Sequence, residues 1–304
     1  MLHLKNELTK VLCVIINYQN WELTCDCIQS LLNANVPGSN ILVIDNASPN
    51  GSLLKIQKMY PDLIYLQNSN NIGFAAANNQ GIKIALERQA HYSILLNNDT
   101  EVKPDSIINL INEMNKQPDM ALGTGRVFIP SKEVRIWYDG GKLISWRGMA
   151  KHFNYNVKVS AISLETKNSE VNFISGCFMC IRMNCIPRLG LLDERFFMYL
   201  EDIEYCARAA KNNLKMLFVP ASEIYHKVKQ EENYNLRVIY YSLRNRLLLI
   251  ELTFSRTASI YVRIVLLLKR IYWFVFDKSR YKILIIAIRD YKNKYYGELI
   301  NELL

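Results

Sequence analysis

Residues 11–48, "VLCVIINYQNWELTCDCIQSLLNANVPGSNILVIDNAS", contain the pattern that decides the fold. The run 11–18 is short, apolar and rich in β-branched side chains, as a buried parallel strand should be. Between Leu23 and Ala34, apolar residues recur at helical spacing. The apolar run at 40–48 ends in an acid and turn-forming residues. This stretch therefore predicts a strand, a helix and a second strand.

The same alternation of strand and helix patterns continues to residue 117. The further segments are a helix at 51–60, a strand at 63–69, a helix at 73–90, a strand at 92–100 and a helix at 103–117. Alternating strands and helices favour a parallel sheet because each helix crosses from one strand to the next. We therefore predict an α/β fold with a doubly wound, mostly parallel sheet and helices on both faces.

Polar residues end each of the four predicted strands. They are Asn17-Tyr18, Asp45-Asn46, Asn68 to Asn71, and Asn97-Asn98-Asp99. In open α/β sheets, ligands bind beyond the carboxyl ends of the strands, so these four ends predict one binding site. Asp45 could accept hydrogen bonds from a base or ribose, and the Asn-rich third loop could offer amides to a nucleotide.

Two common nucleotide-binding motifs are missing from the sequence. It contains neither GxGxxG nor GxxxxGK[ST], which disfavours a dinucleotide-binding Rossmann site and excludes a P-loop. Asp99 directly follows a buried strand, where a carboxylate can hold a hard divalent cation that bridges two phosphates. The alternative is that Asp99 forms a turn or helix cap before Pro104.

Three acids stand together in "FFMYLEDIEYCARAA", residues 196–210. Glu201, Asp202 and Glu204 fall in the first turn of a predicted helix. Acids there offset the partial positive charge of unpaired backbone N–H groups, typically by less than ~1 kcal/mol each. Taken alone, the stretch favours that structural role over a catalytic one.

Six segments together resemble the family 2 glycosyltransferases of the GT-A fold, particularly the rhamnosyltransferase-like branch. They stand in the family's order and cover about residues 10 to 227. The resemblance implies an inverting transfer of a sugar from a nucleoside diphosphate donor to a hydroxyl. The segments are "VIINYQNWELTCDCIQSLL", "ILVIDNASPNGS", "NSNNIGFAAANNQGI", "ILLNNDTEVKPDSI", "ISGCFMCIR" and "GLLDERFFMYLEDIEYCARAAKNNLKMLFVPASEIYHK".

The resemblance also implies roles for individual residues. Asp202 matches the general base, and Glu201 beside it would orient the acceptor or the base. Asp99 matches the last acid of the metal-binding DxD pattern, with Asn97 in place of the first, and His226 matches a histidine that can reach the metal or diphosphate. The implied cofactor is a divalent metal, Mg²⁺ or Mn²⁺. The implied nucleotide-sugar-binding residues are Asn17, Asp45, Asn46, Asn71, Gly73, Asn78, Asn97, Asn98 and Asp99.

The resemblance sets the expected partners. We expect a dTDP- or UDP-linked donor, with rhamnose favoured, and a glycan or lipid-linked glycan acceptor of a cell envelope or polysaccharide. Galactosyl or glucosyl transfer is the alternative within enzymes. An inactive nucleotide-sugar-binding scaffold is the alternative from another class, for which Asn97 is the hint.

Charge divides the 304-residue chain into two regions. The net charge is +9, and from Lys227 to the end there are 15 Lys and Arg against 7 Asp and Glu. The last quarter therefore holds a surplus of 8, and the preceding part is near neutral. We predict a catalytic domain at 1–227 and a basic, apolar helical extension at 228–304.

The extension is apolar but repeatedly interrupted by charges. No charge-free run reaches the ~18–20 residues that a spanning helix needs. Interleaved basic and aromatic residues favour helices that lie on an anionic membrane surface. Packing on the catalytic domain, or a homodimer, is the alternative. The extension is too apolar for a solvated nucleic-acid-binding arm, so no nucleic acid is expected.

Cysteine usage and the N-terminus indicate the compartment. The first ten residues have no apolar core of a signal peptide, and the seven cysteines form an odd set. We therefore expect reduced thiols in a cytoplasmic protein, peripheral at the cytoplasmic face of the membrane. Cys177 and Cys180 form a CxxC within an apolar run, and no second pair completes a zinc site.

Overall fold

The structure is a computed structural model that describes residues 7–227 and 236–299. At its centre is a sheet with the strand order β10-β12-β6-β11-β4-β1-β2-β3, to which β5 and β7 add by pairing with β12 and β6; β8 and β9 form a separate hairpin. The strands are β1 (Val11–Asn17), β2 (Ile41–Asp45), β3 (Ile64–Gln67), β4 (Tyr92–Asn97), β5 (Thr100–Val102), β6 (Met120–Ile129), β7 (Arg135–Tyr138), β8 (Gly141–Ile144), β9 (Met149–His152), β10 (Ser169–Val171), β11 (Phe178–Arg182) and β12 (Lys215–His226).

The N-terminal strands form the parallel part of this sheet. β1 pairs in parallel with β2 and β4, and β2 with β3. Strand β11 then enters antiparallel between β4 and β6, and β12 lies parallel to β6. The predicted α/β fold with a mostly parallel sheet is confirmed.

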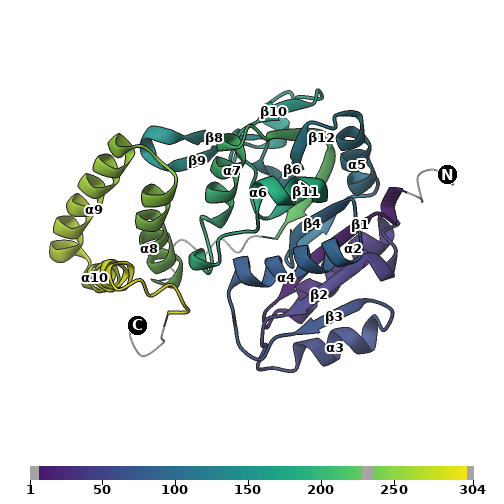
Figure 1. Ribbon diagram of the computed structural model, residues 1–304, viewed down its shortest axis with the longest axis horizontal. Helices are drawn as coiled ribbons and strands as arrows, with labels where there is room; N and C mark the ends of the chain where they lie inside the picture. Colours follow the sequence, from purple (N-terminus) through teal and green to yellow (C-terminus); the bar gives the residue numbers. More distant parts are fainter. Residues whose placement is uncertain (1–6, 228–235, 300–304) are drawn as a thin grey trace.

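The helices fall into two groups in Figure 1. Those of the N-terminal half lie around the sheet on the right, and the last three form a group on the left, with α9 outermost. The helices of four residues or more are α2 (Trp21–Asn33), α3 (Ser52–Met59), α4 (Phe74–Glu87), α5 (Ser106–Lys116), α6 (Ile186–Leu189), α7 (Glu201–Lys211), α8 (Leu236–Leu252), α9 (Arg256–Phe276) and α10 (Lys278–Lys292).

Strand β1 is buried along its whole length, which explains its continuous apolar sequence. Helix α4 packs against it unusually closely. A Cβ at Gly81 would lie 2.4 Å from Cγ1 of Val14, so only glycine lets the helix approach this strand without a shift. The close approach places the N-terminus of α4 near the carboxyl end of the sheet.

The sequence patterns did not predict β6, which is the second-longest strand after β12. Glycines at 123 and 125 weaken its strand pattern, but the structure requires them. A Cβ at Gly125 would lie 2.1 Å from the carbonyl oxygen of Ser222, where β12 bulges between Val219 and Glu223. The apolar run that contains Cys177 and Cys180 forms β11 only from Phe178 onward.

Two hydrophobic clusters make up the interior. The larger lies on the sheet, and the smaller joins α8, α9 and α10. The two clusters do not follow the division of the chain. Leu248 and Leu249 of α8 belong to the larger cluster, and Phe197, just before α7, belongs to the smaller. The division of the chain at residue 227 stays a prediction, and helix α8 contacts both sides of it.

Candidate active site

The carboxyl ends of β1, β2 and β4 meet at one edge of the sheet. The register places Asn17 opposite Asp45 and Ile16 opposite Asn97. Asn46, one residue beyond β2, donates its backbone N–H to the carbonyl oxygen of Asn17 at 2.9 Å. These polar strand ends, which the sequence grouped into one site, are neighbours in the structure.

The Asp45 carboxylate is bonded inside the protein. Its Oδ1 accepts hydrogen bonds from Asn17 Nδ2 and Ser48 Oγ, both at 2.6 Å, and its Oδ2 accepts one from the Ser48 backbone N–H at 2.9 Å. Asn17 in turn accepts a hydrogen bond from the Thr24 hydroxyl at 2.7 Å. Asp45 and Asn17 are both 0% exposed, so in this structure they order the turn after β2. Direct contact of either with a nucleotide stays a prediction.

Asn46 organises the loop that follows β3. Its Nδ2 donates to Asn71 Oδ1 at 2.7 Å, and its Oδ1 accepts from Asn68 Nδ2 at 3.0 Å. Gly73, at the end of this loop, has a φ of +87°, and a Cβ there would lie 2.6 Å from the carbonyl oxygen of Phe197. Only glycine fits where this loop meets the segment before α7.

The amides of Asn78 and Asn98 have different surroundings. Asn78 Nδ2 donates to the carbonyl of Phe74 at 3.0 Å, but its Oδ1 is buried without a hydrogen-bond partner among the described residues. Asn98 Nδ2 donates to the Thr24 hydroxyl at 3.0 Å. Asn78 therefore offers a free acceptor, whereas Asn98 ties the turn after β4 to helix α2.

Asp99 and His226 face each other from different strands. Asp99 lies in the turn between β4 and β5, and β5 pairs with β12, placing Thr100 opposite His226. Oδ1 of Asp99 is 3.0 Å from Nε2 of His226. The Trp137 ring meets the imidazole edge-on, with centroids 4.8 Å apart. The structure thus brings together the two residues that the sequence assigned to a metal.

The surroundings of His226 favour a positive charge. Burial by itself lowers the pKa of this imidazole, but the Cys177 thiol and the Asp99 carboxylate together raise it to about 10. A metal-ligating histidine must be neutral, so a cation bound here would displace a proton.

The Asp99–His226 pair fits a divalent cation only in part. His226 Nδ1 is a buried atom without a hydrogen-bond partner among the described residues, and the carboxylate of Asp99, 3.0 Å from His226 Nε2, suits Mg²⁺ or Mn²⁺. Within 7–227 and 236–299, no group of three or more His, Cys, Asp or Glu side chains could hold a metal. The pair therefore fits a cation whose remaining ligands are diphosphate oxygens and water.

Helix α7 begins with the acidic pair Glu201 and Asp202. Leu200 precedes it in a left-handed conformation, with a φ of +70°. Asp202 Oδ2 accepts a hydrogen bond from the Gly176 backbone N–H at 3.1 Å, and its Oδ1 accepts one from the Ile203 N–H at 2.8 Å. Glu201 is 6% exposed, and its Oε2 has no hydrogen-bond partner in the described chain. Asp202 is only half-buried.

One short segment joins this acidic pair to the strand ends. The Gly176 N–H binds Asp202, and the carbonyl of the next residue, Cys177, accepts from the Asn97 N–H at 3.1 Å. A Cβ at Gly176 would lie 3.7 Å from Glu201 Oε1. The acidic pair and the ends of β1, β2 and β4 therefore border the same region.

The two acids have unequal proton affinity. Burial, together with the neighbouring Asp202, raises the pKa of Glu201 to about 8. Burial also raises the pKa of Asp202, but hydrogen bonds from the backbone N–H groups of Gly176 and Ile203 oppose this rise. Glu201 therefore binds a proton more tightly than Asp202 does.

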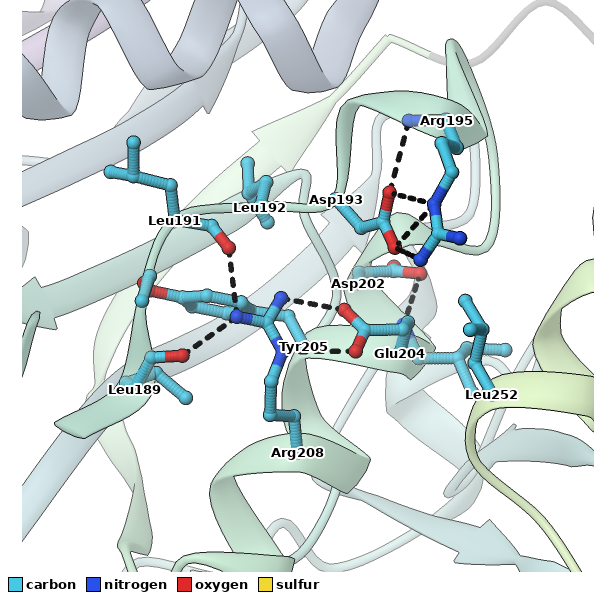
Figure 2. Close-up of polar contacts among 12 residues, drawn as sticks. Leu189, Leu191, Leu192, Asp193, Arg195, Asp202, Glu204, Tyr205, Arg208 and Leu252 are labelled. Atoms are coloured by element: carbon cyan, nitrogen blue, oxygen red, sulfur yellow. Dashed lines mark hydrogen bonds and ion pairs between the residues drawn. The ribbon is translucent and has the colours of Figure 1, made fainter. Parts of the chain in front are cut away.

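The third acid of the stretch, Glu204, has a structural partner. It receives two hydrogen bonds from Arg208, one turn along α7, at 2.9 and 2.7 Å (Figure 2). Arg208 also donates to the carbonyls of Leu189 and Leu191, at 2.6 and 2.8 Å. Through Arg208, this ion pair holds the turn after α6 against α7, and Glu204 therefore has a structural role.

Sequence reasoning missed the contacts of Arg244 and Asn245. Both lie on α8 and are 0% exposed, and both donate hydrogen bonds to backbone carbonyls just before α7. The available signal was a polar pair inside an otherwise apolar helical run, which we attributed to charges that interrupt a membrane-associated segment.

Solved structures with a similar fold are sugar transferases. GalNAc-T7 with UDP, GalNAc and Mn²⁺ matches 79% of this chain and 48% of its own, at a TM-score of 0.63 and 18% identity. The mannosyltransferase PcManGT of Pyrobaculum calidifontis, in complex with GDP-Man and Mn²⁺, matches 95% of this chain and 76% of its own, at a TM-score of 0.56 and 13% identity. The fold is thus that of GT-A glycosyltransferases.

Sequence comparison gives the family. Residues 12–186 match the model of glycosyl transferase family 2, and the chain belongs to this family. The low-salt glycan biosynthesis hexosyltransferase Agl10 of Haloferax volcanii is 25% identical over 259 residues, covering 80% of this chain and 76% of the relative. The rhamnosyltransferase WbbL of Escherichia coli is 24% identical over 252 residues, covering 78% and 95%. The protein is a glycosyltransferase with rhamnosyltransferase-like relatives.

The raised pKa of Glu201 predicts a pH-dependent stability. Its folded-state pKa of about 8 exceeds the ordinary value of 4.5, so between these values the folded state binds more protons. The free energy of unfolding should therefore fall as pH rises through this window. Glu201→Gln should remove that slope and raise Tm near pH ~8.5, by roughly 2–4 °C per kcal/mol recovered.

The measurement is thermal unfolding near pH ~5.5, ~7 and ~8.5 for the wild type and two variants. Glu204→Gln is the matched control, because it breaks the ion pair with Arg208 in the same helical turn and should lower Tm similarly at each pH. If Tm depends on pH in Glu201→Gln as it does in the wild type, Glu201 does not hold the proton.

Proposed function

We propose that the protein transfers a sugar, with rhamnose favoured, from a nucleoside diphosphate donor to a glycan hydroxyl, with inversion at the anomeric carbon. The observation that carries this proposal is the position of Asp202. Its half-buried carboxylate is held by the Gly176 N–H at the start of α7, in the region bordered by the ends of β1, β2 and β4. A carboxylate fixed in such a place is what a general base requires.

In the proposed reaction, the acceptor hydroxyl oxygen forms a bond to the anomeric carbon of the donor. The bond between that carbon and the diphosphate oxygen breaks, and the nucleoside diphosphate leaves with the electron pair. Asp202 takes the proton of the hydroxyl as it attacks. Glu201 keeps its own proton near neutral pH, so it adds no second negative charge and can donate a hydrogen bond to the acceptor or to Asp202.

The leaving diphosphate develops negative charge that needs stabilising. We assign Asp99 and His226 to hold a divalent cation, Mg²⁺ or Mn²⁺, which supplies positive charge to the diphosphate when bound. Support comes from the position of the Asp99 carboxylate, 3.0 Å from His226 Nε2, and from the buried Nδ1 of His226, which has no hydrogen-bond partner among the described residues. Two similar solved structures are described with Mn²⁺. Asn97, in place of a second acid, leaves the protein's share of the ligands small.

We assign the nucleotide to the loops after β1, β2 and β3. Asn46, Asn71 and Gly73 form one hydrogen-bonded loop beside this region, and Asn78 offers a free acceptor on α4. The hydrogen bond between Asn17 and Asp45 stabilises the turn after β2. Asn97 and Asn98 lie between this turn and Asp99, and we include them in the nucleotide site. A buried amide network of this kind can present fixed donors and acceptors to a base, ribose and phosphates.

Names of relatives support the choice of donor and acceptor. A Mycobacterium tuberculosis relative, 25% identical over 202 residues and covering 62% of this chain and 66% of its own, is an N-acetylglucosaminyl-diphospho-decaprenol L-rhamnosyltransferase. We therefore favour a dTDP- or UDP-linked rhamnose donor and a lipid-linked glycan acceptor. Galactosyl or glucosyl transfer is the alternative, which a panel of nucleotide sugars would separate.

An anionic membrane surface is the partner that we propose for helix α9. The outward face of α9 is apolar, and its residues Ile264, Leu267, Leu268, Ile271 and Val275 are each 52–60% exposed. At 100° per residue these five fall within one side of the helix. The opposite side, formed by Val262, Leu266 and Trp273, is buried in the smaller cluster.

Charge on α9 favours an anionic lipid surface over a second protein chain. The sequence of α9 contains four cations and no acid. Arg263 and Arg270 are exposed, and their spacing of seven residues puts them together along one border of the apolar face. Among the described residues, no helix is long and apolar enough to cross a membrane. The pattern suits a helix lying in the interface, at the cytoplasmic face where a lipid-linked acceptor would be met.

Asp202→Asn should reduce sugar transfer by ~10²–10⁴-fold, because the variant keeps the shape of the side chain but cannot take a proton. Donor affinity measured by calorimetry should stay near that of the wild type. Asp119→Asn is the matched control, since exposed Asp119 pairs with Lys215 and should leave transfer unchanged. Transfer by Asp202→Asn within a few-fold of the wild type would remove this role and point to Glu201. Absence of both transfer and donor hydrolysis in the wild type would favour the scaffold.

Asp99→Ala should abolish the part of donor binding that depends on metal, because it removes the carboxylate oxygen ligand. Calorimetric donor titrations with Mn²⁺, Mg²⁺ or EDTA measure this part directly. Glu101→Gln is the control. This exposed acid lies two residues after Asp99 and pairs with Lys227 instead. Equal wild-type donor affinity under all three conditions would rule out a metal in this role.

Arg263→Glu with Arg270→Glu should weaken binding to phosphatidylglycerol-containing vesicles by roughly 30-fold or more, from the loss of two cations near the surface. Leu267→Ser with Ile271→Ser should weaken it at low and high salt alike. Lys58→Glu with Lys83→Glu, at exposed cations far from α9 in the sequence, is the charge-matched control. Cosedimentation measures the binding. Two results would contradict this proposal: wild-type protein that does not bind these vesicles at low salt, and a dimer that Leu267→Ser disrupts. The apolar face of α9 would then bind a second copy of the chain.

A further inference from the structure

The backbone just before α7 is held in an unfavourable conformation. Phe197, Tyr199 and Leu200 have φ angles of +55°, +69° and +70°, and none of them is glycine. L-residues rarely adopt this region, because Cβ then crowds the backbone. Three such residues within four positions persist only where the surrounding structure determines them.

Asn245 of α8 supplies the strongest part of that support. Its Nδ2 lies 2.6 Å from the carbonyl oxygen of Phe196, 2.7 Å from that of Met198 and 2.8 Å from that of Tyr199. Its two amide hydrogens are thus shared among three carbonyls of one short segment. These carbonyls point to a single atom of a residue about 45 positions further along the chain.

Arg244 completes the same contact from the neighbouring position. Its guanidinium is 0% exposed, donates to the Phe196 carbonyl at 3.2 Å and orients Asn245 by donating to Oδ1 at 3.0 Å. It also lies over the rings of Tyr240 and Tyr241, at 5.3 and 5.1 Å from their centroids. Burying a cation is costly, and this one is directed at backbone carbonyls, so its position is tightly specified.

The other side of the segment contacts the loop after β3. The carbonyl of Phe197 accepts a hydrogen bond from the Phe74 N–H at 2.5 Å, next to Gly73. The Phe197 ring stacks on Tyr241 of α8, with centroids 5.3 Å apart. The segment 196–200 therefore lies between α8 and the N-terminus of α4, and α7 with Asp202 begins directly after it.

We propose that Arg244 and Asn245 are positioning residues that hold the segment 196–200 in its left-handed conformation and so set where Asp202 stands. The proposal rests on the proposed role of Asp202 as base. It assigns part of helix α8 to the reaction, although the sequence placed that helix in the extension outside the catalytic domain. Without the three hydrogen bonds, the segment can relax and carry the first turn of α7 with it.

The test compares Asn245→Asp with Leu247→Ala. Asn245→Asp keeps the size of the side chain and the acceptor that Arg244 binds, but it removes the N–H donors. Leu247→Ala weakens the same helix on the opposite side, about 200° away, where Leu247 is buried in the smaller cluster. Asn245→Ala is the second variant if Asn245→Asp does not fold, because water can then reach the carbonyls.

The value of kcat, donor affinity and amide hydrogen exchange are measured at a temperature where each variant is folded, and Tm is measured by thermal unfolding. Asn245→Asp should lower kcat by about 10–100-fold, as expected for a base displaced by about 1 Å, while donor affinity changes little. Amide hydrogen exchange should become faster in residues 73–75 and 196–204 but not elsewhere. Leu247→Ala should lower Tm without either local effect.

Wild-type kcat and wild-type exchange in Asn245→Asp would overturn the proposal. So would an equal loss of kcat in Leu247→Ala with faster exchange throughout the C-terminal helices, because that would indicate stability alone. If the wild type transfers no sugar, the proposed function fails, and the exchange data still decide whether Asn245 holds the segment.

Discussion

The backbone of Gly176 and Cys177 fixes the distance between the two halves of the site. The N–H of Gly176 binds Asp202, and the carbonyl of Cys177 binds the N–H of Asn97. These residues lead into β11, which pairs antiparallel with β4. The bond between Cys177 and Asn97 joins two backbones, and the bond from Gly176 reaches the side chain of Asp202, so the start of β11 links the proposed base to the end of β4. Movement of β11 would therefore shift both.

Burial divides the charges of the site between these halves. Glu201 and Asp202 share a poorly solvated environment, in which two adjacent negative charges are unfavourable, and the proton goes to the more buried Glu201. Asp99 instead pairs with His226, whose raised pKa keeps that half balanced before ligands bind. In the proposed reaction, the acidic pair takes a proton, and the Asp99–His226 pair exchanges a proton for a cation.

The sequence predicted the parallel half of the fold because its strands are buried on both faces and their apolar runs are continuous. It also predicted that Asn17, Asp45 and Asn97 would be neighbours, since parallel strands end at one edge. It did not predict β6, whose Gly123 lies against Met114 of the preceding helix and whose Gly125 lies against the backbone of Ser222, about 100 residues further along the chain. The periodicity of apolar residues in the sequence shows which face of a strand or helix is buried, but it does not show which residues that face contacts.

The C-terminal region shows the same limit for charge. Arg244 and Arg263 contribute equally to the basic surplus of the sequence, yet Arg244 is 0% exposed among carbonyls and Tyr rings and Arg263 faces outward. A buried cation stabilises one conformation of its partners, because any other conformation would leave the charge without hydrogen bonds. Exposed, it adds only a weak, salt-screened attraction. The surplus therefore combines two different environments: a buried cation on α8, which we propose to position the site, and exposed cations on α9, which we propose to meet a membrane surface.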